Sequence, residues 1–240
     1  MPELILGIDD AGRGPVIGPM VLAGCLVKKE DEQKLKALGV KDSKMLTAAR
    51  REDLAENIKE IARDFETKIF TAHEINEMMN SKINLNIIEA VAAAQIINKI
   101  RQKCHSKKIK VILDCPSVNT IAWLGRVKNL VGNAEGLSFV CEHKADVNHM
   151  AVSAASIIAK VERDSKIEKL KKEIRADFGS GYPSDPVTIE FIKKHYNDHK
   201  DKKIFREHWM TLKNILGIDT KKRAMDGHKK KEEQKRLFEE

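Results

Sequence analysis

The chain has 240 residues, of which 42% are hydrophobic and 33% charged, and its formal net charge is +8 at pH 7. This length suits one large domain or a domain with an appendage, and the positive balance favours a polyanionic partner. The sequence contains neither a run of about 20 apolar residues, which a membrane-spanning helix needs, nor a secretory signal, so we expect a cytoplasmic protein without a membrane partner.

Short apolar runs predict strands in the first part of the chain. They lie at residues 4–8, 16–27 and 66–70. Only a glycine-rich turn separates the first two runs, which is typical of a hairpin, so we expect them to pair antiparallel. Apolar periodicity predicts helices over 47–62 and along a long segment that begins near Ile83. Thr71 and Glu74 have the spacing of a capping box, which predicts a helix start.

The second part of the chain alternates strands with helices. Strands are predicted at residues 110–114 and 137–141, and helices at 119–130, at 151–174, from 186 onward and at 208–216. Asp185 and Pro186 suit the start of a helix, in which Ile189, Ile192 and Tyr196 mark the expected buried side. This order of elements predicts a mixed α/β fold with five strands.

Neither the cysteines nor the histidines predict a zinc site. Cys25, Cys104, Cys115 and Cys141 are widely spaced and form no CxxC pair, which favours free thiols over disulfides or bound zinc. The segment HYNDH has two histidines at the i, i+4 spacing of a zinc pair but lacks the glutamate of HExxH. A solvated helix face is therefore the favoured interpretation of that segment.

Four acidic residues follow predicted strands. Asp9 and Asp10 end the first strand, Asp114 ends the fourth, and Asp146 follows the fifth. Strand ends in an α/β sheet converge on one edge, where ligand sites usually lie. Carboxylates at close range repel one another until a proton or a cation relieves the repulsion, and hard oxygens favour Mg²⁺ or Mn²⁺. The alternative is that the acids cap strands and helices. Capping explains any one of them, but it explains the set of four less well.

A glycine-rich turn with one cation, Gly12-Arg13-Gly14-Pro15, follows the first two acids directly. Glycine lets the backbone approach a ligand closely, where N–H and C=O groups are strong hydrogen-bonding partners. Beside paired carboxylates, such a turn indicates a phosphate near a hard cation, although a solvated turn is the alternative. Two ions about 3.5–4 Å apart can hold the attacking and leaving oxygens of a phosphodiester. The pattern therefore favours metal-assisted chemistry on nucleic acid.

Seven stretches between residues 7 and about 209 together resemble one known family. They are GIDDAGRGPVIGP, GVKDSKML, VILD, EHKAD, SAASIIAKVERD, GSGYPSDP and the segment Arg206–Trp209. The chain is similar to archaeal-type ribonuclease HII, the type 2 ribonuclease H family, in which these stretches occur in the same order. Only the tail lies outside the resemblance.

The resemblance implies a ribonuclease H-like α/β fold, with a mixed five-stranded sheet flanked by helices and a helical C-terminal extension. It implies a catalytic domain at 1–175 and a helical substrate-binding region at 176–218. Residues 219–240 are nearly all charged and have almost no apolar periodicity, so we expect a flexible tail there. The implied activity is hydrolysis of the RNA strand of RNA–DNA hybrids, including single ribonucleotides embedded in duplex DNA. Two-metal hydrolysis with Mg²⁺ or Mn²⁺ would leave a 3′-hydroxyl and a 5′-phosphate.

The resemblance also implies roles for individual residues. The matching acids are the metal ligands Asp9, Asp10 and Asp114 and the fourth catalytic acid Asp146. The matching substrate contacts are Gly12, Arg13 and Gly14 at the ribose 2′-hydroxyl, Tyr182 against the sugar at the RNA-to-DNA junction, and Lys44 near the substrate backbone. The 2′-hydroxyl is what distinguishes RNA from DNA, so a glycine turn that approaches it closely suits this role.

One residue departs from the family pattern. The family usually reads IDEAG, whereas this chain has Asp10 in place of the glutamate. Aspartate keeps the charge but is one methylene shorter, and Mg²⁺ tolerates little deviation from octahedral geometry. We therefore expect weaker activity with Mg²⁺ and relatively better use of Mn²⁺. The alternative function is a noncatalytic or weakly active hybrid-binding protein of the same fold.

Other assignments are weaker. A junction resolvase of the same fold is disfavoured by the GRG and GSGYPSDP motifs, and ribonuclease HIII by the lack of room for its additional domain before residue 7. Gln234 and Leu237 faintly resemble a sliding-clamp-binding peptide, although the aromatic residues of such a peptide are misplaced. Lys144, Lys160 and Arg163 are candidates for phosphate contacts, with helix-surface charge as the alternative.

Overall fold

The computed structural model describes residues 3–40, 47–104 and 108–218. Five strands form one sheet in the order β3-β2-β1-β4-β5. They are β1 Leu4–Ala11, β2 Met20–Lys28, β3 Asp64–Phe70, β4 Ile109–Asp114 and β5 Leu137–Glu142. The pairs β1–β2 and β2–β3 are antiparallel, whereas β1–β4 and β4–β5 are parallel. The predicted mixed five-stranded sheet is therefore confirmed.

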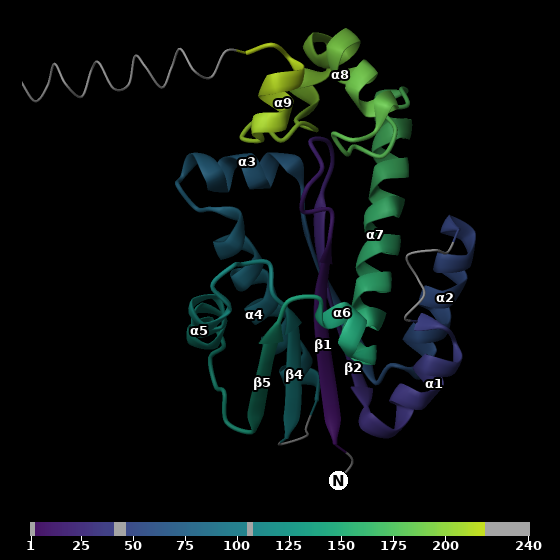
Figure 1. Ribbon diagram of the computed structural model, residues 1–240, viewed down its shortest axis with the longest axis vertical. Helices are drawn as coiled ribbons and strands as arrows, with labels where there is room; N and C mark the ends of the chain where they lie inside the picture. Colours follow the sequence, from purple (N-terminus) through teal and green to yellow (C-terminus); the bar gives the residue numbers. More distant parts are fainter. Residues whose placement is uncertain (1–2, 41–46, 105–107, 219–240) are drawn as a thin grey trace, which may run out of the picture.

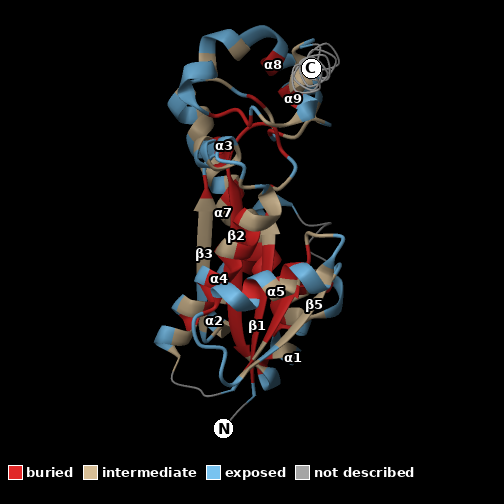
Figure 2. Cartoon of the chain, turned by 90° about the vertical axis from the view of Figure 1, so that its left-hand side faces the viewer, coloured by how far each residue is buried: buried red, intermediate tan, exposed pale blue. Residues whose placement is uncertain are grey.

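Helices cover both faces of the sheet, with α4 and α5 on one side and α1, α2 and α7 on the other (Figure 1). Their bounds are α1 Glu32–Ala37, α2 Ala48–Ile61, α3 Ala72–Asn80, α4 Leu85–Lys103, α5 Thr120–Leu130, α6 Ala145–Asn148, α7 Met150–Ile174, α8 Pro186–His199 and α9 Met210–Ile215, with short 3₁₀ turns η1 Lys29–Asp31 and η3 Lys200–Lys202. Buried residues run along the sheet and the helix layers (Figure 2).

Local sequence explains where several helices begin. The Thr71 hydroxyl accepts a hydrogen bond from the Glu74 N–H and the Glu74 side chain accepts one from the Thr71 N–H, which confirms the predicted capping box. Asp185 accepts a hydrogen bond from Val187 N–H ahead of Pro186, as expected at the start of α8. Side-chain caps satisfy backbone donors that have no partner within the helix.

Strand β1 lies at the centre of the sheet and separates two cores. Leu6 and Ile8 point toward the core that contains α4, whereas Ile5 points toward the core that contains α7. This alternation follows from the two-residue repeat of a strand. Gly7 lets α7 approach the strand closely, because a Cβ at this position would collide with the Ala151 backbone.

A third core joins the C-terminal region to the rest of the chain. Val16 and Ile17, from the loop between β1 and β2, are buried together with residues of α7, α8 and the segment before α9. The N–H groups of Val16 and Ile17 both donate to Gly181 O, at 2.8 and 3.2 Å. The tip of the hairpin is therefore enclosed by residues that lie 150 or more positions later in the sequence, at the end where α8 and α9 lie in Figure 1.

Three predicted details were wrong. The second strand begins at Met20 instead of residue 16, because Pro15, Gly18 and Pro19 interrupt the run and the segment between them bonds to the C-terminal region. The buried side predicted for α8 was wrong in part: Ile192 is buried and Tyr196 packs against the third core, but Ile189 is only half-buried, and Thr188 and Phe191 are buried instead. The last helix begins at Met210 instead of residue 208.

The expectation of free cysteines is consistent with the structure. All four cysteines lie among the described residues and none forms a disulfide. Cys25 and Cys115 are buried, and burial raises the pKa of the Cys25 thiol to about 12. Within the described ranges, no helix is long and apolar enough to cross a membrane.

Candidate active site

The ends of β1 and β4 bring two predicted metal ligands to neighbouring strands. Ile8 pairs with Leu113 in parallel register, so Asp9 and Asp114 both follow directly at the same edge of the sheet. Asp114 Oδ1 accepts a hydrogen bond from Ala145 N–H at 2.8 Å, which ties it to the start of α6, where Asp146 lies. Burial raises the pKa of Asp114, and the charge of Asp146 raises it further. These three acids therefore form one electrostatic group.

Asp9 is buried, with 7% of its surface exposed. Burial raises its pKa to about 8, and the neighbouring charges of Asp10 and Asp114 add to this effect. Hydrogen bonds from Ser156 and from the Asp10 N–H, the latter at 2.8 Å, oppose the shift because they stabilise the charged form. Asp9 thus faces α7, which carries Ser156.

Asp10 points to the opposite face of the sheet, toward α4. Burial raises its pKa to about 7, with a further contribution from the charge of Glu89, while the charge of Arg13 opposes both. Burial likewise raises the pKa of Glu89 to about 7. Glu89 is therefore a fifth carboxylate beside the predicted set. The only signal for it in the sequence is a single acid on a buried face of an otherwise apolar helix.

The four predicted acids suit a hard cation by their chemistry. Within the described part of the chain, no three His, Cys, Asp or Glu side chains are already arranged as a metal cage. Asp9, Asp10 and Asp114 nevertheless lie in a poorly solvated place beside like charges, and both conditions raise their pKa values. A divalent cation relieves such repulsion, and carboxylate oxygens are its preferred donors.

The glycine turn has a backbone conformation that favours glycine. Gly12 has φ +83°, and a Cβ there would lie 2.6 Å from Arg163 Cδ and 2.7 Å from Pro19 O. Gly14 is less crowded, since a Cβ there would have only Tyr182 Cε1 nearby, at 3.9 Å. The structure therefore places Tyr182, predicted to pack on a sugar, beside the turn predicted to sense the ribose.

The Arg13 side chain is bound to helix α4. Its Nε donates to Glu89 Oε1 at 2.7 Å and its Nη2 donates to Asn86 Oδ1 at 2.6 Å. The Glu89 side chain is 1% exposed and that of Arg13 is 39% exposed. The other carboxylate oxygen of Glu89 is buried without a hydrogen-bond partner. The Arg13 side chain thus holds the turn against α4, on the same face of the sheet as Asp10.

Arg163 lies beneath Tyr182 instead of on the helix surface. It is 5% exposed, its guanidinium carbon is 4.9 Å from the centre of the Tyr182 ring, and its Nη2 donates to Ser180 O at 2.7 Å. The helix-surface alternative was therefore wrong for this residue. Because Arg163 also contacts the space beside Gly12, it supports the tyrosine and the turn together.

Arg206 is a second arginine whose position the sequence did not predict. It is fully buried and donates hydrogen bonds to backbone carbonyls of the glycine turn. The motif around it was visible in the sequence, but no spacing rule links residue 206 to residues 12–14. Lys44, the remaining predicted substrate contact, lies outside the described residues.

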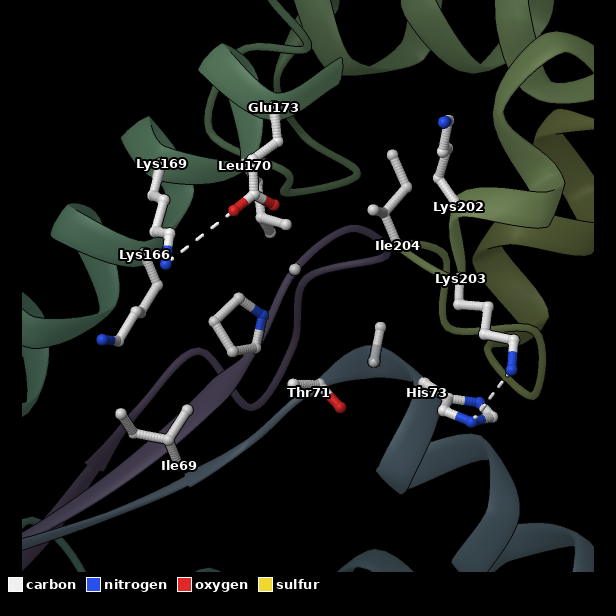
Figure 3. Close-up of a pocket in the computed structure, with 13 residues that line it drawn as sticks. Ile69, Thr71, His73, Lys166, Lys169, Leu170, Glu173, Lys202, Lys203 and Ile204 are labelled. Atoms are coloured by element: carbon white, nitrogen blue, oxygen red, sulfur yellow. Dashed lines mark hydrogen bonds and ion pairs between the residues drawn. The ribbon is translucent and has the colours of Figure 1, made fainter.

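Two pockets bear on the location of the site. One of about 370 Å³ adjoins the glycine turn and is lined by Arg13, Gly14, Met79, Leu85, His208 and Trp209. Another of about 440 Å³ has an apolar floor, which includes Ile69, Leu170 and Ile204, and a rim with several lysines (Figure 3). None of the predicted site residues lines the second pocket. The described site residues predicted from the sequence therefore lie apart from the second pocket, and two of them, Arg13 and Gly14, line the first.

The acids and the turn lie within a region that matches a known family. The family model for ribonuclease HII matches residues 6–212. The chain belongs to the ribonuclease HII family. Ribonuclease HII of Methanocaldococcus jannaschii is 43% identical over 221 residues, which cover 89% of this chain and 95% of that protein.

Solved structures agree with this assignment. Ribonuclease H2 from Pyrococcus horikoshii has a TM-score of 0.77 and 37% identity, and the match covers 89% of this chain and 97% of that one. Ribonuclease HII from Archaeoglobus fulgidus, solved in a complex with PCNA, has a TM-score of 0.75 and 40% identity over 88% of this chain and 96% of that one. The resemblance found in the sequence, the ribonuclease H-like fold and the archaeal type are confirmed.

Membership of this family makes the chain an endoribonuclease of the ribonuclease H type. Such enzymes depend on divalent metal ions and act on RNA–DNA hybrids. The family assignment also favours the ribonuclease over the junction resolvase considered from the sequence.

Proposed function

We propose that this ribonuclease HII cleaves the RNA strand of RNA–DNA hybrids and also cuts at single ribonucleotides embedded in duplex DNA. The observation that carries the proposal is the contact between two groups of residues. The acid-bearing end of β1 leads directly into the Gly12–Gly14 turn, and the end of β4, with Asp114, lies on the neighbouring strand. Tyr182 lies beside Gly14. The proposed catalytic acids and the proposed ribose-recognition residues would thus be adjacent.

The acids would hold the metal in this scheme. Asp9, Asp10 and Asp114 are the proposed ligands of Mg²⁺ or Mn²⁺, and Asp146 is the fourth catalytic acid. When bound, such ions activate water and neutralise charge on the phosphodiester, and the products would carry a 3′-hydroxyl and a 5′-phosphate. The chain contributes by holding Asp9 and Asp114 on adjacent parallel strands and by keeping Asp9 poorly solvated until a cation arrives.

The turn and Tyr182 would recognise the sugar. Gly12 and Gly14 let backbone groups reach a 2′-hydroxyl, which both donates and accepts hydrogen bonds. The flat ring of Tyr182 would cover the sugar on the DNA side of the junction. Arg13 would position the turn and would not bind phosphate, because its side chain is hydrogen-bonded to Glu89 and Asn86. Lys44 is proposed to lie near the substrate backbone.

The remaining assignments concern the C-terminal part and the location of the protein. We propose that residues 176–218 bind substrate, since Tyr182 and Trp209 lie there beside the turn, and that the protein is cytoplasmic. We also propose a sliding clamp as a partner, because the Archaeoglobus relative was solved in a complex with PCNA. Replacement of Leu237 by alanine in the full chain should abolish co-elution with a clamp. Unchanged co-elution would reject this contact.

The decisive experiment compares three duplexes with the same sequence. One contains a single ribonucleotide, one is a full RNA–DNA hybrid, and one is all DNA. Each is incubated with Mg²⁺, Mn²⁺ or chelator, and the cut positions are mapped. We expect cleavage only at ribonucleotides and only with metal. Asp114→Asn purified in parallel controls for a contaminating nuclease. Cleavage of the all-DNA duplex, or no cleavage in either metal, would overturn the proposal and, in the second case, favour the noncatalytic alternative.

A further inference from the structure

Arg206 holds the glycine turn through its backbone. Its Nη2 donates to Gly12 O at 2.7 Å, its Nη1 donates to Arg13 O at 3.0 Å, and its Nε donates to Gly18 O at 3.0 Å. The Arg206 N–H donates to Val16 O at 2.9 Å. A single residue from the C-terminal region therefore contacts carbonyls at both ends of the loop between β1 and β2.

The guanidinium is well suited to this contact. It is planar and presents five donors in a rigid fork, and here it is fully buried. The Trp209 ring covers one side, with its centre 5.0 Å from the guanidinium carbon. Burial lowers the pKa of Arg206 to about 9, which leaves it charged at neutral pH, and the charges of Asp10 and Glu89 favour the charged form.

The two turn carbonyls determine where the neighbouring N–H groups point. Each peptide unit is planar, and the described residues contain no cis peptide bond. In a trans peptide the C=O and the N–H point in opposite directions. Because Gly12 O and Arg13 O face the buried guanidinium, the N–H groups of Arg13 and Gly14 face away from it. Arg13 is partly exposed and Gly14 is exposed, so these N–H groups belong to residues at the surface.

We propose that Arg206 is a positioning residue for ribose recognition, which holds the Gly12–Arg13 and Arg13–Gly14 peptide planes so that their N–H groups face the substrate sugar. This inference rests on the proposed function of the turn. It assigns a role in specificity to a residue that touches neither the acids nor the substrate. It also explains why an arginine is buried here, since no other side chain can donate hydrogen bonds to three carbonyls from one planar group.

The test uses Arg206→Lys in the full chain. Lysine keeps the charge but has a single ammonium group, which cannot reproduce the fork. Arg206→Met removes the charge as well. Thermal unfolding establishes whether each variant folds. If Arg206→Met does not fold, Arg206→Lys alone provides the test. Arg101→Met is the matched control, because Arg101 also donates to a backbone carbonyl, Glu135 O at 3.1 Å, away from the turn.

Two measurements separate positioning from a merely structural role. The first is affinity, in chelator, for a duplex with one ribonucleotide and for the all-DNA duplex of the same sequence. The second is kcat and KM for the ribonucleotide duplex. We expect Arg206→Lys to bind the all-DNA duplex as the wild type does and to lose its preference for the ribonucleotide. We expect kcat to fall on the order of 100-fold, as small misplacements can cause, and Arg101→Met to match the wild type.

The outcomes are distinguishable. A folded Arg206→Lys that keeps the wild-type preference and kcat would overturn the proposal, as would an equal loss of affinity for both duplexes. If the wild type itself binds and treats both duplexes alike, the proposed function of the turn fails, and the role of Arg206 fails with it.

Discussion

Arg13 Nε lies 2.7 Å from Glu89 Oε1, in an ion pair whose acidic partner is only 1% exposed. This contact joins the turn that follows β1 to helix α4, and it places an unpredicted carboxylate next to Asp10. The turn is therefore held from two directions, since Glu89 binds the Arg13 side chain while Arg206 binds the backbone.

The first prediction concerns Glu89→Gln. The amide keeps the shape but not the charge, so Arg13 loses its ion pair. We expect the free energy of unfolding to fall by about 1–3 kcal/mol, less than for a fully buried pair because Arg13 is 39% exposed. Urea unfolding measures this change. Glu66→Gln is the control, since its partners Lys99 and Lys103 are largely exposed, and it should cost at most about 1 kcal/mol. Equal stability of Glu89→Gln and the wild type would contradict the prediction.

The second prediction contrasts two glycines. Gly12→Ala should destabilise the fold by about 1–3 kcal/mol, because the residue has φ +83° and meets Arg163 and Pro19. Gly14→Ala should leave stability nearly unchanged, because its nearest neighbour would be Tyr182 at 3.9 Å. Its cleavage rate should still fall at least tenfold if the sugar occupies that space. Thermal unfolding and cleavage assays, run on both variants, check this. A fully active Gly14→Ala would argue against sugar contact there.

The third prediction concerns pH and metal. The pKa of Asp9 is raised to about 8 and that of Asp10 to about 7, so between about pH 4 and pH 8 the folded protein binds more protons than the unfolded chain. Stability in chelator should therefore fall as pH rises through this window. Mg²⁺ or Mn²⁺ must displace those protons, so we expect the metal-induced increase in Tm to be larger at pH 8 than at pH 6. Thermal unfolding at both pH values, with and without metal, checks this. A metal-induced change in Tm that is absent, or equal at the two pH values, would contradict binding by these acids.

The fourth prediction concerns Asp10→Glu, which restores the residue usual in the family. The longer side chain should reach a bound ion more easily, and Mg²⁺ is the more demanding of the two metals in geometry. We expect the ratio of kcat with Mg²⁺ to kcat with Mn²⁺ to rise severalfold. Asp114→Asn, assayed in the same two metals, should be inactive in both. An unchanged ratio would show that Asp10 already serves as well as glutamate.

Much of the fold was predictable because its determinants are local. The Thr71 capping box, the Asp185 helix start and the apolar runs of the five strands depend on residues that are close in sequence. Asp9 and Asp114 were placed together by a simple rule, since both follow a buried strand and parallel strands end at one edge. The family resemblance then named the acids and the turn.

The sequence by itself thus determined the elements, the fold class and the line of acids at the sheet edge. Only the tertiary structure showed that Asp10 faces Glu89, that Arg163 lies beneath Tyr182, and that Arg206 holds the carbonyls of Gly12 and Arg13. The physical reason is the separation along the chain. Periodicity and capping act over a few residues, whereas these contacts join residues 19 to 194 positions apart and depend on how helices pack against both faces of β1.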